Sequence, residues 1–300
     1  MNKLKCRICK SDHEYQTIRA NNVYGTTEKY KFYQCSVCDL VYLHPPIDKK
    51  LEKKIYQEEF ESFMSKRSNT NAWHSDLELK KANKENIDRR NKVIKPYLNN
   101  AKNVLEIGCS SGFMLDQINK NEVSCFGIEP SNKFSHLLKQ KGYKLFDNLT
   151  KIKNTSFKFD LIMSFFVMEH IDNSKKFIDD QLILLNKNGK IIIEIPCVQD
   201  PLTSLYKIPK FENFYWSIVH HYYFSIKSIS FLLDKINCKY SIIKDQRYDL
   251  SNHITWLEKG KPGGQNFYKN IFSKKTINSY KKDLIKVDKF DTMFLIIGKN

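Results

Sequence analysis

The chain has 300 residues, of which 41% are hydrophobic and 28% are charged, and its formal net charge is +17 at pH 7. This length can bury a large core, and no apolar run approaches the roughly 20 residues of a membrane span, which argues against an integral membrane protein. The positive charge would suit an anionic partner, but the lysines are dispersed, so a compositional bias toward Lys, Asn and Ile is favoured over a dedicated nucleic-acid surface. The first ten residues lack an apolar signal segment, so we expect a cytoplasmic protein with reduced thiols.

The first 48 residues, here called the cysteine unit, are predicted to form a small metal-binding module. Its candidate ligands are two CxxC pairs, formed by Cys6, Cys9, Cys35 and Cys38. Four thiolates complete a tetrahedral zinc site without an open position, so the zinc is predicted to be structural. Such a short unit has little core, and metal binding would supply its folding free energy. Disulfides or free thiols remain the alternative interpretation.

Residues 49–98 are mostly polar, but their apolar residues recur at helical spacing and several of them are aromatic. In one interpretation this region is a lid over a bound ligand, with Tyr56 or Trp73 in contact with it. In the other, the aromatic residues only dock helices onto the core, which is the usual reason for apolar residues at helical spacing. The apolar residues concerned are Tyr56, Phe60, Phe63, Met64 and Trp73.

The stretch at 104–130 has the pattern strand, glycine turn, helix, strand, acidic residue. Small turn residues let the backbone approach a ligand, and a carboxylate after the second strand can accept hydrogen bonds from both hydroxyls of a ribose. The carboxylate of Glu106, two residues before Gly108, would repel a pyrophosphate but would suit a cofactor carrying an ammonium and a sulfonium. An ordinary βαβ unit without a ligand is the alternative. The residues predicted to bind the cofactor here are Glu106, Gly108, Cys109, Ser110, Gly112, Glu129 and Pro130.

This stretch resembles motif I of the class I S-adenosylmethionine (SAM) methyltransferases, with Glu129 in the position of their ribose-binding acid. The resemblance implies a Rossmann-like α/β fold with a seven-stranded sheet whose last two strands form a reversed pair. It also makes Asp147, after the third expected strand, a candidate for holding the adenine amino group. Phe165, at the end of the fourth strand, is expected to face the same crevice as the glycine turn.

The sheet itself is predicted from apolar runs. Its strands are expected at residues 104–107, 123–128, 143–146, 159–165, 190–195, 239–244 and 293–299. After the fourth run, Glu169 and His170 match a "vlEHi" segment of many of these enzymes, either as ligand contacts or as capping and solvated surface residues. Residues 164–167 lack the Asn- or Asp-Pro-Pro-aromatic motif typical of methyltransferases that act on nucleic-acid bases, which argues against that class.

Two adjacent histidines after the fifth strand are candidate catalytic residues. A histidine of near-neutral pKa can take a proton from the acceptor during methyl transfer. His220, with Ser225, matches an "H-l-x-x-F-S" stretch of the same group of enzymes, and His221 is the weaker candidate. Val219 replaces the Glu that precedes this His in many relatives. A packed His that caps the next helix is the alternative.

A third candidate catalytic residue, His253, belongs to an expected insertion at 246–289, between the last two strands. Together with Asn252 and Trp256 it forms part of an "N-H-x-x-W-L-x-x-G-K-P-G-G" element, which resembles one found in a polysaccharide-cluster subset of the family. The resemblance implies that these residues line an acceptor pocket. A rigid surface turn is the alternative.

The overall prediction is a Rossmann-like seven-stranded class I methyltransferase sheet preceded by a four-cysteine zinc ribbon. The expected domains are a zinc-binding module at 1–48, a helical linker or lid at 49–98 and a methyltransferase domain at 99–300. The cysteine unit resembles the module that precedes sugar methyltransferases of antibiotic and surface-polysaccharide pathways. This implies O-methylation of a sugar, nucleotide-linked or within a capsule or O-antigen glycan, with an anionic acceptor and no nucleic-acid partner. An RNA methyltransferase and a non-catalytic adaptor are the alternatives.

Overall fold

The computed structural model describes residues 4–26, 29–55, 62–63, 65, 75–118, 120–130 and 132–300. Four residues considered for a lid lie outside the described residues, namely Tyr56, Phe60, Met64 and Trp73.

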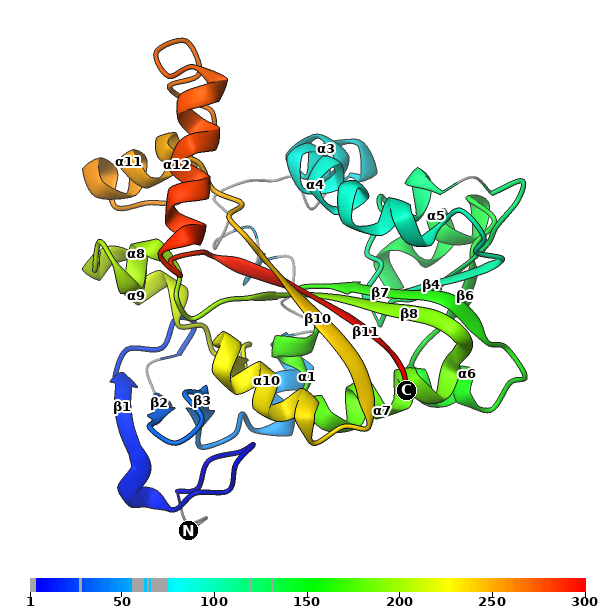
Figure 1. Cartoon of the computed structure of the whole chain (residues 1–300), viewed down its shortest axis with the longest axis horizontal. Coiled ribbons are helices and arrows are strands. Elements are labelled where there is room, and N and C mark those ends of the chain that lie inside the picture. Colours follow the sequence, from blue (N-terminus) through cyan, green and yellow to red (C-terminus); the bar gives the residue numbers. More distant parts are fainter. Residues whose placement is uncertain are drawn as a thin grey trace.

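A seven-stranded mixed sheet forms the centre of the molecule (Figure 1), with the strand order β10-β11-β8-β7-β4-β5-β6. The strands from β4 to β8 are parallel, whereas β11 is antiparallel to both of its neighbours. The expected reversed final pair and the Rossmann-like fold class are thus confirmed. The strands are β4 (Asn103–Ile107), β5 (Ser124–Ile128), β6 (Lys144–Phe146), β7 (Phe159–Phe165), β8 (Leu185–Pro196), β10 (Cys238–Asp245) and β11 (Thr292–Lys299).

Helices cover both faces of this sheet (Figure 1). Because successive side chains of a strand point to opposite faces, Val104 packs against one helical layer and Leu105 against the other. The first layer contains α3 (Asp76–Ala82), α4 (Lys84–Ile94) and α5 (Ser135–Gln140), and the second contains α6 (Leu149–Lys153), α7 (Ser174–Leu184) and α10 (Ile226–Asp234). In the part of the chain that the structure describes, no helix combines the length and apolar character needed to cross a membrane.

The helix expected between the glycine turn and the second strand of the 104–130 stretch is reduced to one 3-10 turn, η5 (Leu115–Gln117). The next residue, Ile118, is already extended. Ion pairs with other parts of the chain hold this segment instead, since Asp116 lies 2.6 Å from Lys80 of α3 and 2.9 Å from Lys141. The prediction of a regular helix here was therefore wrong, because tertiary contacts determine the local conformation.

The cysteine unit forms a small antiparallel sheet that continues into the rest of the chain. Its strands are β1 (Gln16–Ala20), β2 (Lys31–Cys35) and β3 (Val41–His44), and the fourth strand is β9 (Tyr222–Tyr223). Val41 pairs with Tyr223, and the Leu43 amide donates to the His221 carbonyl at 3.0 Å. The predicted domain boundary at residue 48 therefore does not separate the small sheet, because its first three strands precede residue 48 and its fourth strand, β9, follows it.

The expected insertion between the last two strands is helical. It contains α11 (Leu250–Lys259) and α12 (Lys274–Lys286), which project from one end of the sheet in Figure 1. The segment after β8 forms α8 (Pro201–Ser204) and α9 (Pro209–Tyr215), and α1 (Lys49–Lys54) follows the cysteine unit.

A buried ion network joins α4 to the sheet. Glu194 of β8 is completely buried, and it accepts a hydrogen bond from Arg90 Nε at 2.7 Å and pairs with Arg89 at 2.5 Å. Burial alone would raise the pKa of Glu194, but the charges of Arg90, Arg89 and Arg247 outweigh burial and lower that pKa below its ordinary value. The network therefore fixes α4 across the carboxyl end of the sheet.

We expect Glu194→Ala to destabilise the protein by about 3–5 kcal/mol, because it leaves two largely buried guanidinium groups without their counter-charge. The free energy of unfolding, measured by urea denaturation, checks this. Since the folded-state pKa is lowered, the Glu194 contribution is complete above the unfolded-state pKa and is lost as the pH falls through the folded-state value. The difference in the free energy of unfolding between the wild type and the variant should thus become smaller at acidic pH.

The matched control is Asp179→Ala, which removes a surface ion pair with Lys175. Exposed pairs of this kind contribute about 0–1 kcal/mol. Equal stability of the Glu194→Ala variant and this control at neutral pH would refute the role given to the network.

Candidate active site

The turn after β4 is built to bring the backbone close to the carboxyl ends of the strands. Gly108 has φ +73°, Ser110 has φ +48° and Gly112 has φ +79°, in the left-handed region that glycine adopts without steric cost. The Gly108 amide donates to the Ile128 carbonyl at 2.7 Å, which ties the turn to the end of β5. A Cβ added at Gly108 would lie 2.6 Å from Val167 Cγ2, so this glycine also allows the segment after β7 to pack closely.

Two carboxylates flank this turn. Glu106 is 3% exposed, and its Oε2 atom has no hydrogen-bond partner among the described residues. Burial raises the pKa of Glu106 well above its ordinary range; the Arg90 charge opposes this shift and the Glu129 charge adds to it. Glu129, directly after β5, accepts a hydrogen bond from the Ser110 amide at 2.8 Å. A buried carboxylate that lacks a donor matches a cationic ligand group, so these residues fit the ammonium and ribose of SAM.

The other residues predicted to bind the cofactor occupy different surroundings. Phe165 is buried at the end of β7, and Pro130 is exposed. The Cys109 sulfur packs beside Gly127 of β5, where an added Cβ would lie 2.7 Å from it, so its backbone is the part that can face a ligand. Asp147 lies after β6 at the edge of the sheet, is exposed and pairs with Lys151. The cofactor roles of these residues remain predictions.

Two arginines that the sequence did not single out stack on aromatic rings next to this turn. Phe166 has φ +58°, a strained conformation for a bulky residue. The Arg247 guanidinium lies 4.3 Å from the Phe166 ring centroid, and the Arg90 guanidinium lies 4.4 Å from that of Phe165. The Phe166 amide donates to the carbonyl of Glu194 at 2.9 Å. The end of β7 is thus held between two cations, a feature for which the sequence carries no local signal.

Three polar side chains come together where the segment after β7 meets the segment before β9. The potential ligand atoms of Glu169, His170 and His220 all lie within 4.8 Å of one another. Glu169 is 1% exposed, so the interpretation of this residue as solvated surface was wrong. Burial raises the pKa of Glu169 to about 8. A carboxylate therefore does face His220, although it comes from after β7 rather than from position 219.

His221 joins the cysteine unit to the rest of the protein. It is buried, its Nδ1 accepts from Arg7 at 3.3 Å and its Nε2 donates to Glu52 at 3.1 Å. Arg7 also pairs with Asp172 and stacks 4.6 Å from the ring centroid of Tyr222. Both ring nitrogens of His221 thus have partners that do not belong to a substrate, and its catalytic role remains a prediction.

His253 is buried in the insertion. Its Nδ1 lies 2.5 Å from the Tyr280 hydroxyl, and burial lowers the pKa of His253 to about 4. Asn252 donates to the Gly263 carbonyl at 2.7 Å, and the Trp256 ring lies 4.9 Å from that of Phe211 in α9. These three side chains therefore make contacts that hold the insertion together, and their predicted place in an acceptor pocket remains untested.

The four cysteines of the two CxxC pairs form one cluster. Their sulfur atoms lie within 4.8 Å of one another, with Cys6–Cys38 and Cys9–Cys35 separations of 3.5 Å. Sulfur atoms bound at about 2.3 Å to a tetrahedral zinc ion lie about 3.8 Å apart, so the cluster fits this ion. None of the four forms a disulfide. The hydrogen bond from Cys38 lowers the pKa of Cys6 to about 5, which favours a thiolate in the cluster.

Comparison with curated proteins finds relatives that match part of the chain. Two tRNA U34 carboxymethyltransferases from strains of Campylobacter jejuni are each 27% identical to the chain over 123 residues. The match covers 36% of this chain and 40% of each relative, so it spans less than half the length of these curated proteins.

Solved structures of similar architecture include a SAM-dependent methyltransferase from Archaeoglobus fulgidus, with 20% identity, a TM-score of 0.48, and coverage of 72% of this chain and 94% of that one. Another is a SAM-dependent methyltransferase from Thermotoga maritima, described as a possible histamine N-methyltransferase. It has 17% identity, a TM-score of 0.48, and coverage of 80% of this chain and 98% of that one.

A family model described as "Methyltransferase domain" matches residues 78–241. The matched region contains the glycine turn, both flanking carboxylates and the Glu169–His170–His220 cluster. Because this region makes up more than half of the chain, the chain belongs to the methyltransferase-domain family, and the resemblance to SAM-dependent methyltransferases is confirmed.

Proposed function

We propose that the protein transfers the methyl group of SAM to an oxygen atom of a sugar. The observation that most directly supports SAM as the donor is Glu106, a buried carboxylate with an oxygen that lacks a hydrogen-bond partner among the described residues, beside a glycine turn. Glu106 would bind the ammonium of SAM, and Glu129 would bind the ribose hydroxyls. Asp147 would lie toward the adenine. SAM supplies a methyl group on a sulfonium, which is already a good leaving group, so the residues of the chain mainly align donor and acceptor.

The acceptor side of the reaction requires a group that takes a proton. As the oxygen–carbon bond forms and the sulfur–carbon bond breaks, the acceptor hydroxyl loses its proton. We propose that His220 accepts this proton. Its ring lies 4.7 Å from that of His170 and close to the Glu169 carboxylate. His220 is partly exposed, whereas His221 and His253 are buried. This difference in access supports His220 over the other two.

The sugar acceptor rests on the resemblance of the cysteine unit and of the element at 252–264 to those of polysaccharide-pathway enzymes. The net charge of +17 and the arginines near the end of β7 suit an anionic sugar such as a nucleotide-linked one. We also propose a cytoplasmic location, with which eight free cysteines agree.

Zinc bound by the cysteine unit would act structurally. Four thiolates leave no open coordination position. The ion would fix the CxxC knuckle that carries Arg7 and would support the sheet that β9 completes. Zinc would thus stabilise the segment on which His220 lies.

An RNA methyltransferase is the second candidate, because the curated relatives above are named for a tRNA substrate and the chain is strongly basic. On the sugar proposal, filter binding of labelled total tRNA should show no retention at 50 mM salt. Binding whose logarithm falls steeply with the logarithm of the salt concentration would favour the RNA candidate instead.

We expect Glu106→Gln to weaken SAM binding about 10- to 100-fold, since it removes the charge that faces the ammonium but keeps the side-chain shape. Because the Glu106 pKa is raised, the wild type should release a proton when SAM binds, and its affinity should rise with pH until the group is fully ionised. Titration calorimetry in buffers of different ionisation enthalpy measures both quantities.

The control for this experiment is Glu122→Gln, at an exposed position. It should bind SAM and release protons as the wild type does. The assignment of Glu106 fails if its Gln variant keeps both the wild-type affinity and the wild-type proton release.

We expect purified protein to contain about one tightly bound zinc per chain, and Cys38→Ser to lose most of it. The variant should also melt at a lower temperature, because zinc binding contributes to folding. Metal analysis and thermal circular dichroism check these points. The control is Cys238→Ser, outside the cluster, which should keep its zinc. A zinc content that is equal in the two variants would exclude the four-cysteine site.

A further inference from the structure

The cluster of Glu169, His170 and His220 has a property that the proposed methyl transfer does not explain. Glu169 is 1% exposed, and neither of its carboxylate oxygens has a hydrogen-bond partner among the described residues. One of these oxygens lies 3.9 Å from Nε2 of His170. A buried carboxylate is costly unless a cation or a donor compensates it. When Glu169 is ionised, the cluster therefore requires a positive group between its members.

The hydrogen bonding of His170 shows which of its nitrogens faces Glu169. Its Nδ1 lies 2.8 Å from the carbonyl oxygen of Val219, and a carbonyl oxygen can only accept. Nδ1 thus carries the proton, and in the neutral ring the lone pair of Nε2 points toward the carboxylate. A histidine that donates one ring N–H to a backbone carbonyl while the other nitrogen faces a carboxylate has the second-shell arrangement usual for metal ligands.

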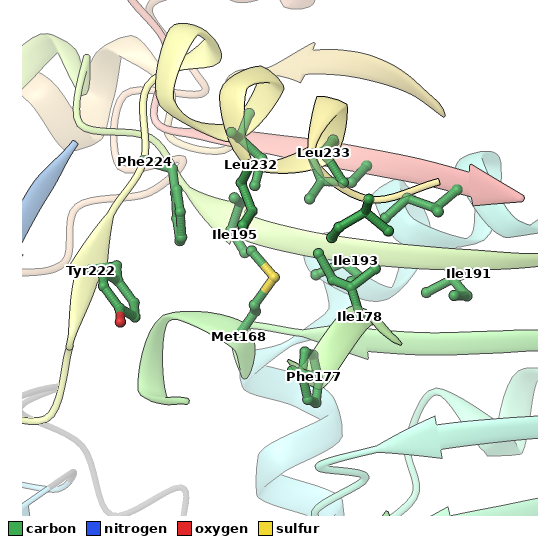
Figure 2. Packing of buried hydrophobic residues seen from close by; sticks show 14 of the residues in the cluster. Met168, Phe177, Ile178, Ile191, Ile193, Ile195, Tyr222, Phe224, Leu232 and Leu233 are labelled. Atoms are coloured by element: carbon green, nitrogen blue, oxygen red, sulfur yellow. The ribbon is translucent and has the colours of Figure 1, made fainter. Parts of the chain in front are cut away.

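The surrounding structure holds the two contributing segments together. The His221 amide donates to the Glu169 carbonyl at 2.7 Å. Figure 2 shows Met168, the neighbour of Glu169, packed beside Ile195 in the same buried cluster as Tyr222 and Phe224. These contacts come from three separate parts of the chain. The side chains of the cluster therefore extend from a fixed backbone frame.

We propose that Glu169, His170 and His220 bind a divalent first-row transition-metal ion. Two imidazole nitrogens and one carboxylate suit Zn²⁺, Co²⁺, Mn²⁺ or Fe²⁺, whereas Mg²⁺ and Ca²⁺ prefer oxygen ligands. Ligand atoms at 2.0–2.2 Å from an ion lie about 3–4 Å apart. The candidate atoms here lie within 4.8 Å of one another, and the Glu169 Oε1–His170 Nε2 separation is 3.9 Å, so the cluster is close to the size that an ion requires. The site is separate from the four-cysteine cluster and has a different ligand chemistry.

Three protein ligands leave coordination positions open. On the proposed function, which this one consequence requires, an open position would receive the acceptor hydroxyl and lower its pKa. With the ion bound, His220 would act as a metal ligand rather than as the proton acceptor, and the hydroxyl proton would pass to water. Metal binding itself does not depend on that function. Its test therefore uses neither SAM nor an acceptor, and its failure would leave the methyltransferase proposal intact.

The test is equilibrium dialysis of the full-length, zinc-loaded protein against Co²⁺, with the bound cobalt measured by metal analysis and absorption spectroscopy. We expect about one Co²⁺ per chain in addition to the zinc, with the weak visible bands of nitrogen and oxygen ligation. Intense near-ultraviolet bands would instead show thiolate ligation and replacement of the zinc. Glu169→Gln and His220→Gln should each weaken Co²⁺ binding at least tenfold.

Exposed positions supply the matched controls, Glu122→Gln and His136→Asn, which should bind Co²⁺ as the wild type does. Circular dichroism verifies that each variant is folded. If the Glu169→Gln variant does not fold, the His220→Gln variant, which changes a partly exposed residue, provides the test. If the wild type binds no second ion, the proposal is overturned, and a proton rather than a metal ion compensates the Glu169 carboxylate. Unchanged binding in the folded variants would overturn it as well.

Discussion

One buried carboxylate, Glu194, joins α4 to the central sheet next to the glycine turn. Arg90 lies on the buried face of α4, a position where an apolar residue would normally pack, and its charge is tolerable there because Glu194 accepts its hydrogen bond. The same guanidinium stacks on Phe165 and opposes the raised pKa of Glu106. This pair therefore contributes both to the position of α4 and to the electrostatic surroundings of the glycine turn.

Two further buried carboxyl groups lie near the carboxyl end of the sheet. Glu106 and Glu169 are both buried next to it, each with at least one oxygen that lacks a partner among the described residues. On the proposed function, Glu106 would lie on the donor side of the site and Glu169 on the acceptor side. A cationic cofactor beside one and a cation beside the other would complete the charge balance that the protein alone leaves open.

The sequence predicted those features whose signals are local. Strands buried on both faces read as continuous apolar runs, so all seven strands of the central sheet were found. The glycine turn and the CxxC pairs depend on spacing within a few residues. The Arg90–Glu194 pair, the burial of Glu169 and the two-residue strand β9 join positions far apart in the chain. No local pattern reports such contacts, and the helix expected after the glycine turn failed for the same reason.

The pairing of β3 with β9 also affects how the chain is made. The cysteine unit leaves the ribosome before the central sheet, and the strand that covers the edge of β3 begins only at Tyr222. During the synthesis of the central sheet, the backbone N–H and C=O groups of Val41 to His44 lack this partner. Open strand edges recruit other chains. During synthesis the edge of β3 therefore stays open for a long interval, and early capture of metal by the four cysteines would hold the cysteine unit folded until β9 is made.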